Sequence, residues 1–213
     1  MYRLSKVKIE WSSKFAYAIG LIATDGCLSG DRRHIDFTSK DEELVLKFRE
    51  CLGINNKVGI KQRGKDKYKM NTCFRVQFCD TNFYEFLVAI GLTPAKSKTL
   101  GKLSIPKEYF WDFLRGCIDG DGTIGVSKHP ESIHPQLKIR LYSASSKFLL
   151  WLKEEIKQLS DLEGGWIEDA IKSSRVYKLS FAKKDSIKLL RLIYNQDCCL
   201  SRKYEPVKYL FQN

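Results

Sequence analysis

The sequence predicts a mixed α+β protein made of two pseudo-symmetric halves, each with the element order αββαββα and one antiparallel sheet. The first observation is a duplicated helix end, because an apolar helical segment stops at Asp25-Gly26 and another stops at Asp121-Gly122. The second is that the same series of period-two strands and helically spaced segments follows each stop. A repeat this long indicates a duplicated half-domain rather than a solenoid unit. The halves span 1–93 and 107–213, and a linker over 94–106 joins them.

The first half begins with a helix over about 12–24, and a glycine follows its end, as helix C-termini prefer. A strand at 34–38 comes next, and then a helix at 41–52 with leucine and phenylalanine on one face. A later strand at 74–78 alternates apolar with polar residues, and Asp80 caps the helix that closes this half.

The second half repeats this plan with a helix from about 107 to 121, a strand at 136–142, a helix with an apolar face at 148–159 and a strand at 177–181. Asp185 is placed like the capping aspartate of the first half. The second half is the longer one, and a loop insertion around 128–135 accounts for the difference.

The chain is strongly basic, with 37 lysines and arginines against 25 acidic residues and a formal charge of +12. This excess favours a polyanionic partner, either nucleic acid or an anionic membrane surface. The seven cysteines form no Cys-x-x-Cys pair and complete no metal pattern with the histidines, which argues for reduced thiols and against zinc. The longest apolar stretches are too short to span a bilayer, and the start lacks an export signal. We expect a soluble intracellular protein of the cytoplasm, nucleoid or an organelle of its host.

Two segments carry a family signature. Residues 114–122, Leu-Arg-Gly-Cys-Ile-Asp-Gly-Asp-Gly, resemble the LAGLIDADG sequence itself, and residues 18–26, Ala-Ile-Gly-Leu-Ile-Ala-Thr-Asp-Gly, are a looser copy. With the repeated element order, the chain resembles the two-motif, single-chain LAGLIDADG homing endonucleases over nearly its whole length. The resemblance implies half-domains that pack through the two signature helices, with the sheets forming a saddle for DNA. The first copy has Ala23 and Thr24 where the family has Asp and Ala, so we expect the two half-sites to differ.

Small residues in both segments allow the two helices to approach closely. Gly20 with Thr24, and Gly116 with Gly120, lie four residues apart on one helical face. A close crossing brings together the two helix ends, which carry unpaired carbonyls and the negative poles of the helices.

The same helix ends carry Asp25 and Asp121, and two carboxylates this close repel one another and raise each other's pKa. A divalent cation resolves the conflict, and hard oxygen ligands favour Mg²⁺, with Mn²⁺ or Ca²⁺ as substitutes for binding. The resemblance implies that both aspartates are catalytic metal ligands, each serving one DNA strand, and that the carbonyls of Thr24 and Gly120 join them. A calcium loop starting at Asp119 is excluded, because its sixth and twelfth residues are not glycine and glutamate. A plain turn explains one Asp-Gly end but not the duplicated plan.

The resemblance also implies a catalytic lysine after the last helix of each half. Lys96 and Lys203 align at this position, where a lysine polarises water or stabilises charge. Lys98 is an alternative for the first position, and a solvated surface lysine is an equally valid interpretation of each.

Basic and amide side chains dominate the predicted solvent faces of the strands. Lysines and arginines there neutralise phosphates, while arginine and glutamine also read base edges in a major groove. We expect DNA contacts from His34, Lys57, Lys61, Arg63, Lys69, Arg75, Gln77, Gln136, Lys138, Arg140, Arg175 and Lys178. An ordinary solvated strand face is the alternative for each single residue.

The resemblance, together with these features, implies an intron-encoded, site-specific homing endonuclease that we expect to act as a monomer on a long, pseudo-palindromic double-stranded DNA site. We expect metal-dependent hydrolysis of phosphodiester bonds that leaves a staggered break with 3′ overhangs. One alternative is an intron RNA maturase, because basic faces alone do not distinguish RNA from DNA. Another alternative is a DNA-binding regulator of the same fold that does not cut.

Overall fold

The computed structural model describes residues 5–63, 71–127, 136–171, 175–194 and 199–211. The first half consists of α1 (Ser13–Thr24), β1 (Gly26–Leu28), β2 (His34–Ser39), α2 (Glu42–Cys51), β3 (Val58–Arg63), β4 (Asn71–Cys79) and α3 (Thr81–Ala89). The second consists of α4 (Phe110–Asp121), β5 (Gly122–Ser127), β6 (Gln136–Ser143), α5 (Ser146–Leu159), β7 (Trp166–Ile171), β8 (Val176–Phe181) and α6 (Lys183–Ile193). The predicted αββαββα order is therefore confirmed in both halves.

Short elements lie outside the two repeats. Three 3₁₀ helices cover Lys96–Lys98, Lys107–Tyr109 and Glu205–Phe211, and α7 (Ser201–Tyr204) comes before the last of them. The predicted linker contains the first 3₁₀ helix and buries Leu100 and Leu103. It is thus a structured segment that packs against the core, while the exact boundaries of the halves stay a prediction.

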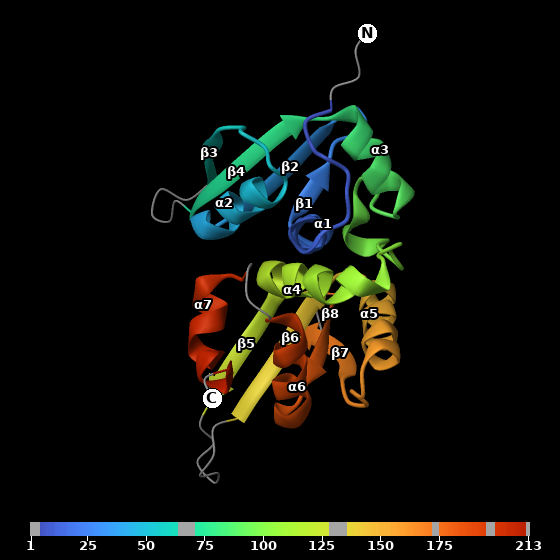
Figure 1. The fold of residues 1–213 in the computed structure, drawn as a ribbon, viewed down its shortest axis with the longest axis vertical. Coiled ribbons are helices and arrows are strands. Elements are labelled where there is room, and N and C mark those ends of the chain that lie inside the picture. Colours follow the sequence, from blue (N-terminus) through green and yellow to red (C-terminus); the bar gives the residue numbers. More distant parts are fainter. Residues whose placement is uncertain (1–4, 64–70, 128–135, 172–174, 195–198, 212–213) are drawn as a thin grey trace.

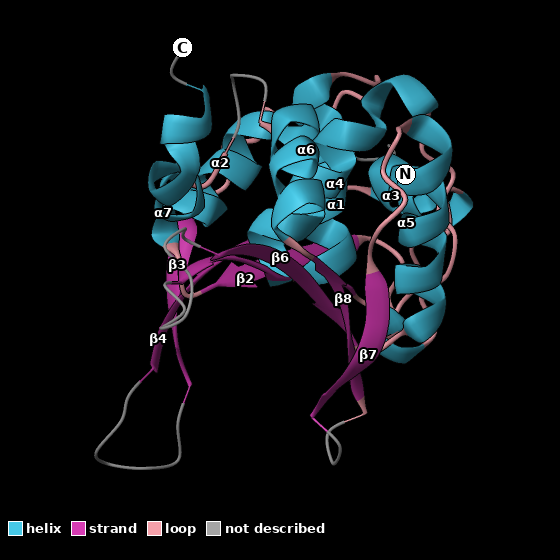
Figure 2. Ribbon diagram, turned by 90° about the horizontal axis from the view of Figure 1, so that it is seen from below, coloured by secondary structure: helices cyan, strands magenta, loops and turns pink. Residues whose placement is uncertain are grey.

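Each half contains a four-stranded antiparallel sheet, in the orders β1-β2-β4-β3 and β5-β6-β8-β7. Apolar residues such as Ile35 and Phe37 in β2 are buried under the helices, while the residues between them are only half-buried. This alternation leaves one face of each sheet free of helices. The two sheets form an arch, with the helices on its outer side and the open faces beneath (Figure 2). The predicted fold class and its saddle shape are confirmed.

The two halves meet along α1 and α4, which lie side by side at the centre of the molecule (Figure 1). Helix α1 starts where the sequence indicates, because the Ser12 side chain accepts a hydrogen bond from the backbone N–H of Phe15 at 3.2 Å. All residues of α1 from Phe15 to Ala23 are buried. A helix that is apolar on every side must be covered on every side, and here its own sheet and α4 cover it.

One predicted cap is wrong. Asp80 does cap α3, since its carboxylate accepts from the N–H of Phe83 at 2.9 Å. Asp185 does not cap α6, because that helix already begins at Lys183, with Ala182 at the N-cap position. Asp185 instead lies in the first helical turn, where a carboxylate faces the positive end of the helix dipole.

Two further predictions concern segments that the structure does not describe. The proposed insertion over 128–135 and the DNA contact expected from Lys69 fall on residues that the structure does not describe. In the described part of the chain, every helix is too short or too polar to cross a lipid bilayer.

Candidate functional site

The crossing of α1 and α4 depends on glycine at two facing positions. A Cβ atom built on Gly20 would lie 2.1 Å from the carbonyl oxygen of Phe113, and one built on Gly116 would lie 2.2 Å from that of Tyr17. Both obstacles are backbone atoms, which cannot rotate away as a side chain can. The small residues therefore set how closely the two helices, and the groups at their ends, approach one another.

The crossing brings Asp25 and Asp121 together at the C-terminal ends of the two helices. A Cβ atom on Gly120, next to Asp121, would lie 3.4 Å from the carboxylate of Asp25. Burial, together with the negative charge of Asp121, raises the pKa of Asp25 from 3.8 to about 6. Asp121 lies at an exposed helix end, but the protein atoms around its carboxylate still raise its pKa. The carboxylates thus share one electrostatic environment.

The oxygen atoms at this junction suit a hard divalent cation. Asp25 and Asp121 supply carboxylates, and the ends of the helices supply carbonyl groups, including those of Thr24 and Gly120, the residues directly before the two aspartates. No cluster of three or more His, Cys, Asp or Glu side chains is arranged for a metal among the described residues. The assignment of these four ligands stays a prediction.

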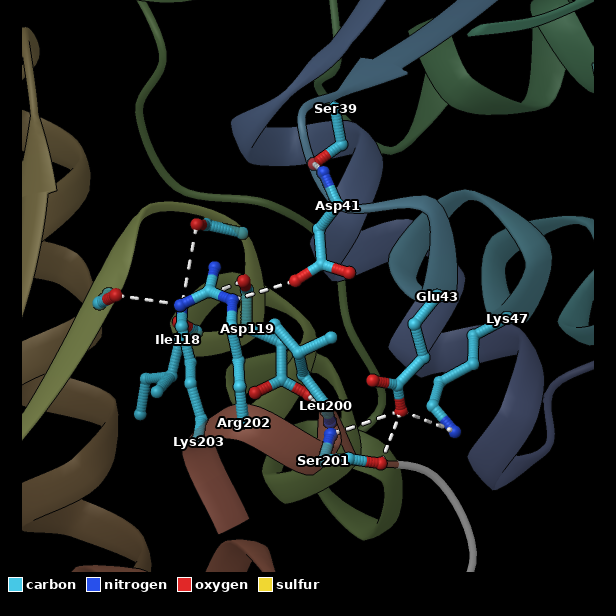
Figure 3. Close-up of polar contacts among 12 residues, drawn as sticks. Ser39, Asp41, Glu43, Lys47, Ile118, Asp119, Leu200, Ser201, Arg202 and Lys203 are labelled. Atoms are coloured by element: carbon cyan, nitrogen blue, oxygen red, sulfur yellow. Dashed lines mark hydrogen bonds and ion pairs between the residues drawn. The ribbon is translucent and has the colours of Figure 1, made fainter. Parts of the chain in front are cut away.

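Lys203 lies against the end of α4. Its ammonium group donates to the carbonyls of Ile118 at 2.6 Å, Asp119 at 2.7 Å and Gly122 at 2.7 Å, with Gly120 at 3.5 Å (Figure 3). The residue is only 5% exposed, and burial lowers the pKa of its side chain to about 8. Its positive charge therefore lies beside the two carboxylates and neutralises the negative end of α4.

Lys96 occupies the matching position in the first half. It is buried, its ammonium donates to the carbonyl of Gly26 directly after Asp25, and burial lowers its pKa. Lys98, two residues on, is exposed. The geometry thus favours Lys96 over Lys98 as the lysine that faces the junction, although its catalytic role stays a prediction.

Asp119 is a functional candidate that the sequence reasoning missed. Its carboxylate is fully buried between the halves and accepts from the hydroxyl of Tyr17 at 2.8 Å, the hydroxyl of Tyr194 at 3.1 Å and the N–H of Leu200 at 2.8 Å. Burial raises its pKa. The contact with Leu200 holds the segment that carries Lys203. The sequence did contain a feature that pointed to Asp119: it is the first aspartate of the second signature segment, whereas the first segment has Ala23 at the matching position.

The open face of the first sheet brings several predicted DNA contacts together. Thr38 in β2 pairs with Arg75 in β4, and Asp36 pairs with Gln77, so their side chains share this face. Arg75 is not free, because its guanidinium forms an ion pair with Asp36. This acidic partner was not predicted. An arginine fixed by a carboxylate presents its remaining donors in a defined direction.

The other predicted residues of this half lie around the same face, except Lys69, which is outside the residues that the structure describes. Gln77 and Lys57 are exposed, Lys61 is half-buried in β3, and Arg63 is the last residue of that strand. His34 begins β2 and contacts Asp31 through its ring nitrogen.

The open face of the second sheet is similar. Gln136, Lys138 and Arg140 alternate along β6 with buried apolar residues, so they point to the same side. Lys178 in β8 pairs with Tyr142 of β6 and forms an ion pair with Glu168 at 3.3 Å. Arg175, in the turn directly before β8, is exposed and has a positive φ of 48°. The contacts of these residues with DNA stay predictions.

Two crossed helices that end in aspartates above a two-sheet saddle define the LAGLIDADG fold, and comparison with known proteins agrees. The family profile of the LAGLIDADG-like domain matches residues 12–90. The predicted resemblance to the LAGLIDADG family is thus confirmed: the first half carries this domain, and the second half repeats its fold on the same chain. A search of curated proteins finds no match.

Solved structures of the same fold cover most of the chain. The homing endonuclease I-WcaI, bound to its DNA recognition sequence, is 13% identical with a TM-score of 0.65, over 96% of this chain and 87% of that one. I-DmoI, in complex with DNA and Mn, is 18% identical with a TM-score of 0.55, over 87% of this chain and 98% of that one. Full-length DUF199/WhiA from Thermatoga maritima is 20% identical with a TM-score of 0.55, over 96% of this chain but only 62% of that one.

Proposed function

We propose that this protein is a site-specific, divalent-metal-dependent DNA endonuclease of the homing type. The observation that carries the proposal is the pair of aspartates at the ends of two tightly crossed helices, with a raised pKa for each carboxyl group. Two negative charges held this close are unfavourable unless a cation accompanies them. The site lies where the two sheets meet, so a duplex along the saddle would present its backbone to the carboxylates.

Asp25 and Asp121 would hold Mg²⁺, or Mn²⁺ in its place, with help from the carbonyls of Thr24 and Gly120. When bound, the metal supplies Lewis-acid stabilisation of phosphate charge and a more acidic water. Each aspartate would serve one strand, which gives a staggered break with 3′ overhangs.

Lys203 would act as a fixed positive charge more than as a proton carrier. Its ammonium group gives hydrogen bonds to the carbonyls of Ile118, Asp119 and Gly122, which engage all three of its N–H donors. Its charge stabilises negative charge that develops on the phosphate nearby. Lys96 would play the same part at the other strand, through the carbonyl next to Asp25.

DNA would lie along the open faces of the two sheets. The basic residues there, with a formal charge of +12 for the chain, would neutralise phosphates, and Arg75, Gln77, Gln136 and Arg140 would read base edges. Binding would weaken steeply with salt, because phosphate contacts release counterions. We propose that one chain suffices, since both halves of the saddle lie on it, and that the gene lies in an intron.

The test is selection of cleaved duplexes from a randomised DNA library with Mg²⁺, followed by assays of Asp25→Asn and Asp121→Asn on the selected site. Each single variant should bind the site but only nick it, and the double variant should bind without cutting. Asp161 is an exposed aspartate two residues after the end of α5, so Asp161→Asn is the matched control and should cut both strands.

Two outcomes would favour the alternatives. The match to WhiA shows that this fold is not confined to proteins named as homing endonucleases, so specific binding without cleavage would support a regulator. Preferential binding of structured RNA, with promotion of splicing, would support a maturase. Cleavage that persists in the double variant would refute the assignment of the two aspartates.

A further inference from the structure

Helices α2 and α5 occupy the same position in the two halves and start in the same way. The N–H of Asp41 donates to the Ser39 hydroxyl at 3.1 Å, and the N–H of Ser145 donates to the Ser143 hydroxyl at 3.1 Å. Aspartate and serine at an N-cap ordinarily accept a hydrogen bond from an N–H two or three residues later. Neither Asp41 nor Ser145 makes this bond. The Asp41 side chain contacts the second half instead, and the Ser145 side chain contacts the linker that follows the first half.

In the first half, α2 contacts the segment that carries Lys203. Asp41 forms an ion pair with Arg202 at 2.7 Å. Glu43, in the first turn of the helix, accepts from the N–H of Ser201 at 3.0 Å and from its hydroxyl at 2.6 Å (Figure 3). The two residues that precede Lys203 are therefore both bound from across the junction.

In the second half, α5 contacts the segment that carries Lys96. The hydroxyl of Ser145 donates to the carbonyl of Leu100 at 2.5 Å, and both residues are buried. The N–H of Leu100 in turn donates to the carbonyl of Lys96 at 2.8 Å, which closes the turn around this lysine. On both sides of the pseudo-two-fold axis, the N-cap residue of one helix thus contacts the segment that carries the lysine of the other site.

These contacts fix the positions of the two lysines more than they stabilise the fold. Helix α7 spans only four residues, too few to hold its own conformation in water. The Arg202 side chain is 61% exposed, and exposed ion pairs contribute little to folding. A lysine ammonium on a flexible stem reaches a fixed place only if its backbone is fixed.

We propose that each half positions the site lysine of the other half: Asp41 and Glu43 position Lys203, and Ser145 positions Lys96. Each site that cuts one DNA strand then depends on residues from both halves. The contacts of Asp41, Glu43 and Ser145 fix the position of one site relative to the other. Asp41, Glu43 and Ser145 are positioning residues, not catalytic ones, because they lie behind the lysines. This inference rests on the proposed function.

The test follows the nicking of each strand separately on a selected DNA site. Lys203→Met and Lys96→Met identify the strand that depends on each lysine. Glu43→Ala should slow the Lys203-dependent strand by about tenfold to a hundredfold, with DNA affinity unchanged, because a small misplacement of a site group has effects of this size. Ser145→Ala should slow the other strand alone.

Three controls separate positioning from general damage. Glu43→Gln keeps an oxygen acceptor for Ser201 and should restore the rate, whereas Glu42→Ala, on the same turn, should alter neither strand. Ser201→Ala changes an exposed residue and removes only the hydroxyl bond to Glu43, so it should give a smaller strand bias in the same direction as Glu43→Ala, without loss of folding.

The outcomes are distinct. An unchanged strand ratio in Glu43→Ala and Ser201→Ala, or equal slowing of both strands, overturns this inference while the proposed function stands. A wild-type protein that cuts neither strand overturns the proposed function and this inference with it.

Discussion

Replacement of Gly116 by alanine would test whether backbone contact between α1 and α4 sets the geometry of the site. The added Cβ atom would lie 2.2 Å from the carbonyl oxygen of Tyr17, 3.0 Å from the Cα of Gly20 and 3.1 Å from the N of Leu21. Ordinary contact begins at 3.4 Å, so the closest approach is short by 1.2 Å. The helices must separate by a comparable distance.

Two energetic effects oppose each other in this variant. Alanine favours a helix interior over glycine by about 1 kcal/mol, whereas overpacking of a tight core costs about 1–3 kcal/mol or more. Because the obstacles are backbone atoms, we expect the upper part of that range and a net loss of about 2 kcal/mol in the free energy of unfolding. For a chain of 213 residues this lowers the Tm by about 4–8 °C.

The effect on cleavage should exceed the effect on stability. Asp25 and Asp121 stand at the ends of the separated helices, and a shift of about 1 Å at a catalytic group costs about a hundredfold in rate. The assays are thermal unfolding and single-turnover cleavage well below the Tm. Gly101→Ala is the control, because an added Cβ meets nothing within 4 Å there. A Gly116→Ala protein as stable and as fast as wild type would refute the reasoning.

Two further predictions concern buried polar groups. Tyr17→Phe removes one of three donors to Asp119 and should destabilise the protein by about 1–3 kcal/mol, measured by denaturant unfolding; a neutral effect would show that the bond adds nothing. The pKa of Asp25 rises from 3.8 to about 6 on folding, so its stabilising contribution is present below pH 3.8 and lost as the pH rises through 6. Mg²⁺ should therefore raise the Tm more at pH 7.5 than at pH 4.5, and Asp25→Asn should reduce that difference; equal shifts at both pH values in wild type would contradict the assignment.

Local patterns were sufficient to predict the elements and the fold class. Alternation of apolar residues in β2, β4 and β6 reflects burial of one sheet face, and the duplicated Asp-Gly ends mark α1 and α4. The glycines at 20 and 116 predicted a close helix crossing, because only glycine leaves room for a second backbone. These inferences succeed because each depends on residues that are near one another in the sequence.

The sequence by itself thus determined the two-half fold, the pair of aspartates and the basic strands. Only the tertiary structure decided which partners these groups meet: Asp36 holds Arg75, Asp119 joins Tyr17 to Leu200, and Glu43 reaches Ser201 from the other half. The wrong prediction for Asp185 has a similar cause, because packing decides at which residue its helix begins. The physical reason is that hydrogen bonds and ion pairs form between groups brought together by the folded chain, and their separation along the sequence leaves no local pattern.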